Sequence, residues 1–208
     1  VQEEGYYDYR MNPTPWGFFL NAKPQRPEDL IEYDFDKAPT MQIPGDWNTQ
    51  DDRLFFYEGT VWFKRSFDWH SNTDHRTLLY FGAINYDSYV YVNGKLAGHH
   101  IGGFTPFNMD VTDLLKEGEN VVIVKADNKR RAENVPSQIF DWWNYGGITR
   151  DVLLVEVAPT YIENYRLLLD KSDTRQLLFS VKLNKQEANR QISLVIPELK
   201  IKKTVTIR

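Results

Sequence analysis

The sequence predicts an all-β protein, and three observations lead to this fold class. Short segments rich in β-branched and aromatic residues recur at regular spacing between Thr60 and Val157. Glycine, proline, asparagine and aspartate lie between them, as tight turns require. None of these segments keeps a 3.6-residue apolar period. The connections are uneven and often long, which favours a two-sheet jelly-roll β-sandwich over a barrel.

Composition limits the classes of function. The 208 residues are 41% hydrophobic and 14% aromatic, enough for a sizeable core and unlike a disordered chain. The 25 basic and 29 acidic residues form no basic block, which argues against nucleic acid or an anionic membrane surface as the partner. Without cysteine there are no disulfides or thiolate metal sites, and the compartment is left open. No segment reaches the roughly 18 apolar residues of a membrane span.

The first part of the chain contains little regular structure. Residues 1–27 form an N-terminal arm in which prolines at positions 13, 15, 24 and 27 exclude long strands or helices. Within it, the apolar stretch Trp16–Leu20 is expected to form an edge strand or to dock onto the sandwich. Residues 44–48 then form a turn that delivers Trp47, which we expect to pack in the core.

The central part contains the strands of the sandwich. Asn93-Gly94 predicts a two-residue hairpin turn, because both residues tolerate positive φ. Thr112–Gly118 predicts one helical turn closed by glycine. The segment from Thr60 places Val61 and Phe63 on one face, and the segment from Asn120 is expected to be buried on both. The predicted strands are Thr60–Trp69, Arg76–Ile84, Tyr86–Val92, Lys95–Gly98, Phe107–Val111, Asn120–Asp127 and Val152–Val157.

The chain divides at Ala158-Pro159, because proline ends the preceding strand. Residues 1–158 then form the jelly roll, and residues 159–208 form a second unit of about four strands. An immunoglobulin-like sandwich needs about seven strands and about 100 residues. We therefore interpret 159–208 as the first half of such a domain, with exposed edges that can pair with a second chain. The four strands are Tyr161–Asp170, Gln176–Leu183, Asn189–Ile196 and Thr204–Ile207.

The candidate functional stretch is Asp141–Val152, in which a carboxylate, three large aromatics and an amide precede a Gly-Gly turn. Carboxylates and amides hydrogen-bond sugar hydroxyls, and aromatic rings stack on the C–H face of a sugar. In an extended segment only one of two adjacent tryptophans faces the ligand. Arg150 is expected to make a structural contact, and Asp141 could instead be a turn aspartate bonded to its own backbone. The candidate substrate-binding residues are Asp141, Trp142, Asn144 and Tyr145.

Other polar residues are interpreted more simply. The adjacent His99 and His100 have no acidic or histidine partner at a convincing ligand spacing, so hydrogen-bonded loop histidines are favoured over a metal site. Glu58 and Asp46 are interpreted as solvated loop acids. No metal and no cofactor is expected.

Four segments, taken in order, resemble glycoside hydrolase family 2, the family of the β-galactosidases, β-glucuronidases and β-mannosidases. Residues 62–67 (WFKRSF) are similar to a strand of its N-terminal domain. Residues 89–98 (YVYVNGKLAG) resemble its Asn-Gly hairpin. Residues 100–107 (HIGGFTPF), followed by Asp110-Val111-Thr112, and the stretch 141–152 match two further motifs. The resemblance is close over about residues 40–158.

The resemblance implies a galactose-binding-domain-like jelly roll, then an immunoglobulin-like domain, then a (β/α)₈ barrel with two catalytic glutamates. It implies that Asp141 holds hydroxyls of the sugar being cleaved. The barrel motifs are absent, so no catalytic residue is expected in this chain, and the chain alone is expected to be inactive. The implied partners are a β-glycoside and the protein's own barrel, with a homo-oligomer left open. A freestanding carbohydrate-binding module is the alternative, followed by a structural or adhesion protein.

Overall fold

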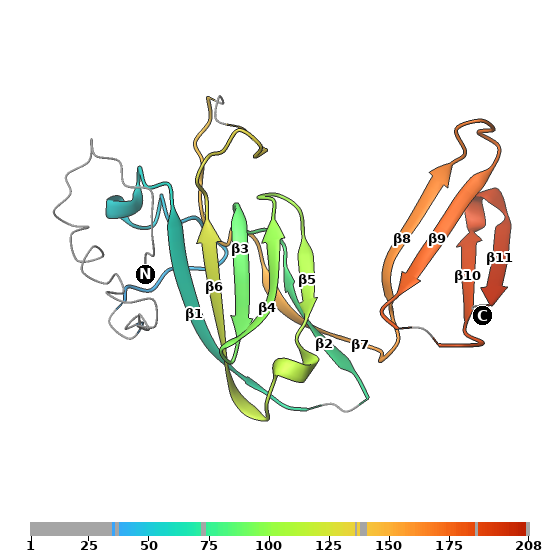
Figure 1. Cartoon of the computed structure of the whole chain (residues 1–208), viewed down its shortest axis with the longest axis horizontal. Coiled ribbons are helices and arrows are strands. Elements are labelled where there is room, and N and C mark those ends of the chain that lie inside the picture. Colours follow the sequence, from blue (N-terminus) through green and yellow to red (C-terminus); the bar gives the residue numbers. More distant parts are fainter. Residues whose placement is uncertain are drawn as a thin grey trace, which may run out of the picture. The chain divides into compact units, whose positions relative to one another are not determined.

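The computed structural model describes residues 35, 38–71, 74–135, 137, 141–185 and 187–206 (Figure 1). These residues form β-strands and short 3-10 helices, which confirms the all-β fold class. The chain divides into two compact units, Val1–Glu156 and Val157–Arg208. The arm of residues 1–27, including Trp16–Leu20, lies outside the described residues. In the described ranges no helix has the length and apolar character needed to cross a membrane.

The first unit contains two antiparallel sheets. One has four strands in the order β1-β6-β3-β4, and the other has three in the order β5-β2-β7 (Figure 1). The strands are β1 (Thr60–Trp69), β2 (Arg76–Phe81), β3 (Asp87–Val92), β4 (Lys95–Ile101), β5 (Phe107–Asp110), β6 (Gly118–Asp127) and β7 (Val152–Val157). The short helices η3 (Asp52–Leu54) and η4 (Thr112–Leu114) lie in the connections.

A single hydrophobic core joins the two sheets. Val90 and Val124 of the four-stranded sheet belong to the same buried cluster as Phe81 and Met109 of the three-stranded sheet. Trp47 is fully buried in this cluster, which confirms the sequence prediction for that residue. Burying aromatic and β-branched side chains between two sheets is the main stabilising contribution in a sandwich of this kind.

In the four-stranded sheet, β3 and β6 each bury one face, and β4 has no fully buried residue. In β1, Val61 is buried and Phe63 packs against the core, as predicted. The prediction that the segment from Asn120 is buried on both faces was wrong: burial alternates along β6, with Val124 buried and Lys125 only half-buried. Lys125 lies instead over the ring of Trp62 on the neighbouring strand, with its Nζ 5.6 Å from the ring centroid. The outer face of β6 is therefore partly solvated, and its aliphatic residues there do not form a second core.

The turn predictions agree with the backbone. Asn93 and Gly94 both have positive φ, 51° and 78°, so the hairpin between β3 and β4 has the predicted turn. The predicted helical turn is the short 3-10 helix η4. The prediction that glycine closes it was wrong, because η4 ends at Leu114 and Gly118 is the first residue of β6. His99 and His100 lie within β4, which extends three residues beyond the predicted end at Gly98, so the expected loop histidines are strand residues.

The second unit consists of two separate hairpins. Strands β8 (Ile162–Leu169) and β9 (Leu177–Leu183) pair in one sheet, and β10 (Gln191–Ile196) and β11 (Ile201–Thr206) pair in the other, with η5 (Pro197–Leu199) between β10 and β11. Every residue of β8 is exposed. A two-stranded sheet buries too little apolar surface to be stable alone. That residues 159–208 belong to an immunoglobulin-like domain stays a prediction.

Candidate functional site

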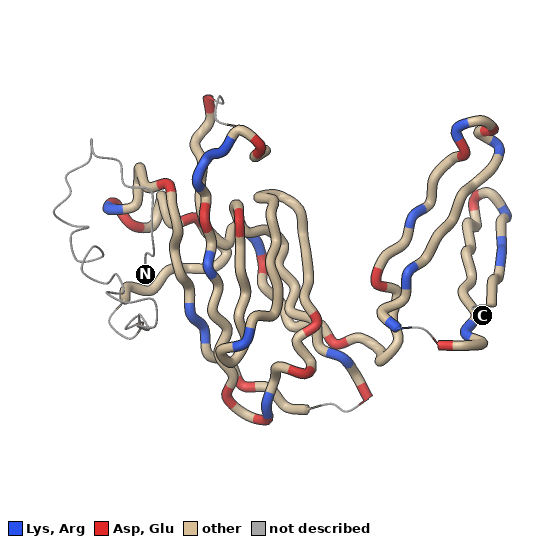
Figure 2. The backbone as a smooth tube through the Cα atoms, viewed as in Figure 1, with Lys and Arg blue, Asp and Glu red and all other residues tan. Residues whose placement is uncertain are grey.

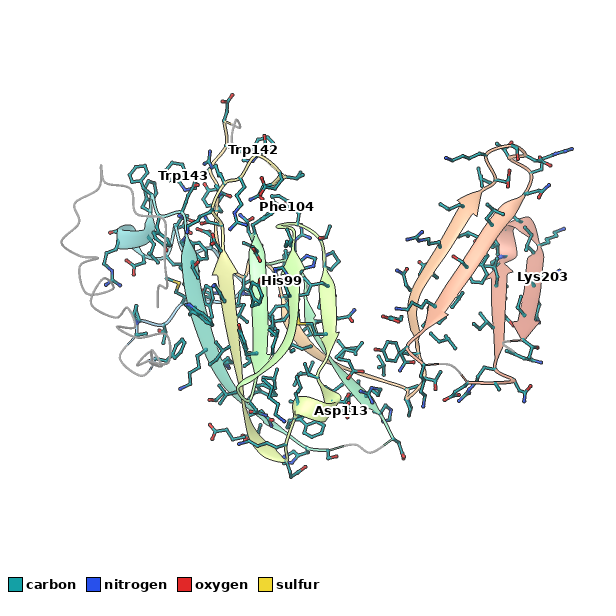
Figure 3. The ribbon with its side chains drawn as sticks, viewed as in Figure 1. His99, Phe104, Asp113, Trp142, Trp143 and Lys203 are labelled. Atoms are coloured by element: carbon teal, nitrogen blue, oxygen red, sulfur yellow. The ribbon has the colours of Figure 1, made fainter. Side chains whose placement is uncertain are left out.

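The residues from Asp141 to Gly147, called the lip below, lead towards β7 along the chain. Figure 3 shows Trp142 and Trp143 at the same end of the first unit as Phe104. Asp141 is exposed, and 58% of Trp142 is exposed. The structure therefore places a carboxylate and an indole ring next to each other in the chain and open to solvent, where a ligand can reach both.

The base of the lip is bonded to the sandwich through its backbone. Gly147 and Asn85 form an isolated antiparallel bridge, in which the Asn85 N–H donates to the Gly147 carbonyl at 2.9 Å. On the other side the Trp47 N–H donates to the Gly146 carbonyl, also at 2.9 Å. The strand predicted from Arg76 ends at Phe81 rather than at Ile84. The residues that follow, up to Asn85, lead to the bridge with Gly147 instead.

A buried asparagine joins the lip to the turn that follows η3. The Asn48 Oδ1 accepts a hydrogen bond from the Gly146 N–H at 2.9 Å. Its Nδ2 lies within hydrogen-bonding distance of the carbonyls of Leu54, Phe55 and Tyr57, at 2.9, 3.2 and 3.1 Å. Only 2% of Asn48 is exposed, so these bonds form out of contact with water and hold the two segments together.

Asn144 is bonded inward. Its Oδ1 accepts from the Nδ2 of Asn85 at 3.2 Å, and its Nδ2 donates to the carbonyl of Asn128. The Asn128 Nδ2 in turn donates to the Asn144 carbonyl at 2.8 Å. Both polar atoms of the Asn144 side chain are thus engaged within the protein, whereas 47% of Tyr145 is exposed.

The glycines of the lip are required by close packing. A Cβ on Gly146 would lie 2.0 Å from Cζ2 of the buried Trp47, and one on Gly147 would lie 2.7 Å from the Gly45 carbonyl. Gly147 also has a φ of 139°, a region that residues with a side chain rarely adopt. The Gly-Gly turn that the sequence predicts thus has two causes: backbone conformation requires glycine at Gly147, and the contact with Trp47 requires it at Gly146.

We expect Gly146→Ala to lower the free energy of unfolding by about 2–4 kcal/mol, because Trp47 cannot move without disturbing the core. Urea unfolding monitored by circular dichroism measures the change. Gly94→Ala is the matched control, since a Cβ at Gly94 meets nothing within 4 Å although its φ is positive. Gly146 is not one of the glycines with a positive φ, so its loss must come from the contact with Trp47. A loss no larger than that of Gly94→Ala would show that the core accommodates the added Cβ.

Sequence reasoning missed an aromatic cluster beside the lip. Trp143 packs against Phe55 and Phe56, with ring centroids 4.9 and 5.3 Å apart, and lies 6.5 Å from Tyr145. Phe55 and Phe56 are 43% and 58% exposed. The adjacent phenylalanines that follow Leu54 were the available signal, because two neighbouring large apolar side chains on a surface form a patch rather than an isolated exposed residue.

The acidic residues Glu58 and Asp46 make more contacts than the solvated loop acids that the sequence predicts. Glu58 is half-buried and its Oε1 lies 2.8 Å from the Nε of Arg130, so the prediction of a solvated loop acid was wrong. Burial raises the pKa of Glu58, and the charge of Arg130 opposes that rise. Asp46 accepts hydrogen bonds from the N–H and hydroxyl of Thr49, at 2.8 and 2.9 Å.

Arg150 and the two histidines make structural contacts. The Arg150 Nη1 donates to the Phe104 carbonyl at 3.0 Å, which agrees with the structural contact expected for this residue. His99 Nε2 lies 2.6 Å from Asp87 Oδ1, and the His100 ring stacks on Phe107. Burial lowers the pKa of His100. Within the described part of the chain, no three histidine, aspartate or glutamate residues are grouped as a metal would require.

Comparison with known proteins relates this geometry to a family. Residues 10–158 match the model described as "Glycosyl hydrolases family 2, sugar binding domain". A putative beta-glucuronidase of Formosa agariphila is 34% identical over 155 residues, which are 70% of this chain and 18% of that protein. A beta-galactosidase of Thermoanaerobacter pseudethanolicus is 30% identical over 161 residues, 70% of this chain and 21% of that one.

Solved structures agree. The beta-glucuronidase of Bifidobacterium dentium, determined with coumarin-3-O-glucuronide, superposes with a TM-score of 0.62 at 25% identity, covering 81% of this chain and 35% of that one. For a beta-glucuronidase from an uncultured Clostridium sp. the TM-score is 0.61 at 26% identity, covering 98% and 38%. The chain spans about a fifth of the length of the Formosa agariphila and Thermoanaerobacter pseudethanolicus proteins. The chain belongs to glycoside hydrolase family 2, and residues 10–158 are its sugar-binding domain.

Proposed function

We propose that this chain is the N-terminal, non-catalytic sugar-binding region of a retaining β-glycosidase of the β-galactosidase or β-glucuronidase type. The observation that carries the proposal is the exposed Asp141 beside the exposed Trp142, on a lip held by buried hydrogen bonds. A recognition group on a rigid support binds without the entropic cost of ordering a loop. The family membership supports this reading over a freestanding module.

In this proposal each exposed residue of the lip has a role. The carboxylate of Asp141 accepts hydrogen bonds from two neighbouring hydroxyls of the sugar. The ring of Trp142 packs on the C–H face, and Tyr145 contributes its hydroxyl. Asn144 serves the site indirectly, because its side chain is already bonded to Asn85 and Asn128.

The chemical step belongs elsewhere in the protein. Retaining hydrolysis needs two carboxyl groups about 5–5.5 Å apart, one as nucleophile and one as acid and base. The relatives are several times longer than the residues they share with this chain. The proposal assigns both catalytic carboxyl groups to a barrel outside residues 1–208, and the lip to one wall of the pocket.

Residues 1–208 alone are expected to bind methyl β-D-glucuronide, methyl β-D-galactoside and cello-oligosaccharides with Kd values weaker than about 1 mM, because a single wall buries too little of the sugar. Isothermal titration calorimetry measures this directly. The control is Trp142→Ala, which removes the exposed ring. Submillimolar binding that Trp142→Ala abolishes would instead establish the freestanding carbohydrate-binding module.

A further inference from the structure

A second loop lies at the same end of the first unit as the lip. It comprises residues 102–106, connects β4 to β5, and is called the 104 loop below. Its central residue, Phe104, is 57% exposed, and Figure 3 shows it at the end of the first unit that also contains Trp142 and Trp143. Single exposed apolar residues are common, but several large ones at one end of a domain form a patch that indicates a binding surface.

The backbone of the 104 loop is held on both sides of the phenyl group. The Phe104 carbonyl accepts a hydrogen bond from the Arg150 Nη1 at 3.0 Å. A Cβ on Gly103 would lie only 2.5 Å from the Asn85 Oδ1, so the loop packs directly against that side chain. The phenyl ring is therefore exposed on a supported backbone, as a recognition group requires.

The same two side chains connect the 104 loop to the lip. The Oδ1 of Asn85 faces Gly103, while its Nδ2 donates to the carbonyl of Tyr145 in the lip. Arg150, which bonds to Phe104, follows the last residue of the lip by three positions. The 104 loop and the lip thus share one support, and their exposed aromatic rings belong to one connected surface.

The chemistry of the 104 loop differs from that of the lip. Residues 101–108 contain no Lys, Arg, Asp or Glu, and the loop is tan throughout in Figure 2. A phenyl ring has no hydrogen-bond donor or acceptor, so it cannot read the orientation of a hydroxyl group as a carboxylate does. It can pack on a flat apolar surface, and best on another aromatic ring. In a β-glycoside that surface belongs to an aromatic aglycone rather than to the sugar.

We propose that Phe104 is a specificity residue of the β-glycosidase and packs against an aromatic aglycone while Asp141 holds the sugar. The inference rests on the proposed function, because it requires the lip to form one wall of the substrate pocket. It adds the class of substrate. Glycosides with an aromatic leaving group are preferred over alkyl glycosides of the same sugar, and this chain contributes to that preference through one exposed ring.

Phe104→Ala in the full-length β-glycosidase tests the inference with two substrates that share one sugar. With the nitrophenyl β-glycoside, kcat/KM is expected to fall about tenfold, and with the methyl β-glycoside less than about twofold, because only the first has a ring for Phe104 to contact. Phe104→Tyr keeps the ring and is expected to stay within about twofold of the unaltered enzyme with both substrates. The release of free sugar measures both reactions.

Leu96→Ala is the matched control. Leu96 is 54% exposed, similar to Phe104, but it lies at the other end of β4, next to the Asn93-Gly94 turn. It is expected to leave kcat/KM unchanged with both substrates. Because Phe104 is exposed, Phe104→Ala is also expected to keep the Tm of the unaltered enzyme. Equal losses of kcat/KM with the two substrates, or no loss with either, would overturn the inference.

Asp141→Ala separates this inference from the proposed function. The carboxylate of Asp141 acts on the sugar, so its removal is expected to lower kcat/KM by the same factor with both substrates. Near-normal kinetics of Asp141→Ala with both substrates would remove the proposed role of the lip. An unselective Phe104→Ala, beside a strong effect of Asp141→Ala, would remove only the contact with the aglycone.

Discussion

Asp141→Ala is expected to lower kcat/KM about 100-fold or more in the full-length β-glycosidase proposed above. Losing two hydrogen bonds from a carboxylate to sugar hydroxyls removes about 3 kcal/mol of transition-state stabilisation, and each 1.4 kcal/mol is a factor of ten. The effect falls on the chemistry rather than on folding, because Asp141 is exposed and its removal leaves no cavity. Steady-state hydrolysis of nitrophenyl β-glucuronide and nitrophenyl β-galactoside measures the loss.

Asp151→Ala is the matched control for this experiment. Asp151 is also exposed and lies ten positions further along the chain, where the structure shows its carbonyl accepting from the Gly82 N–H. A backbone bond survives the substitution, so kinetics close to those of the unaltered enzyme are expected. Near-normal kinetics in Asp141→Ala itself would remove the assignment of Asp141 to the substrate.

Asn48→Ala is expected to lower the free energy of unfolding by about 2–4 kcal/mol. The substitution leaves the Gly146 N–H and the Phe55 carbonyl without the partner that Asn48 supplies, in a region where Asn48 is 2% exposed. The carbonyls of Leu54 and Tyr57 each lose one donor and keep another. Each buried polar group left unsatisfied costs about 1–3 kcal/mol. Chemical unfolding of residues 1–208 measures the change, and a drop in Tm of about 10 °C should accompany it.

The comparison for Asn48 is an asparagine that is exposed on a strand. Asn108→Ala on β5 removes a side chain of the same size from a solvated position and is expected to change the stability by less than about 0.5 kcal/mol. A small effect of Asn48→Ala, similar to that of Asn108→Ala, would mean that water replaces the lost hydrogen bonds. At Gly146 the lip would then depend on the hydrogen bond from the Trp47 N–H alone.

The strands were predictable because the sequence patterns that define a strand extend over only a few neighbouring residues. β1 and β7 begin and end as predicted, because alternating side chains and bounding turns define a strand locally. The face assignment of β6 failed for a different reason. Val121 and Ile123 are apolar in sequence, but whether a partner covers that face depends on how the two sheets pack.

The candidate site was predictable in part. Asp141 and Trp142 stand in a motif that is readable from the chain, and the structure shows both exposed. The supports of that motif come from far away in sequence. Asn48 lies 98 positions from the glycine it holds, and Asn85 lies 59 positions from Asn144. No local pattern distinguishes a buried asparagine of this kind from one in an ordinary turn.

The sequence by itself determined the fold class, the succession of strands along the chain and the stretch that contains Asp141 and Trp142. Those properties depend on side-chain alternation, turn chemistry and the identity of neighbouring residues. Only the tertiary structure decided that Glu58 is half-buried against Arg130, that Asn144 bonds inward and that Trp143 meets Phe55 and Phe56. The physical reason is that burial and hydrogen-bond partners depend on which distant segments the two sheets bring together, and a linear pattern does not contain those distances.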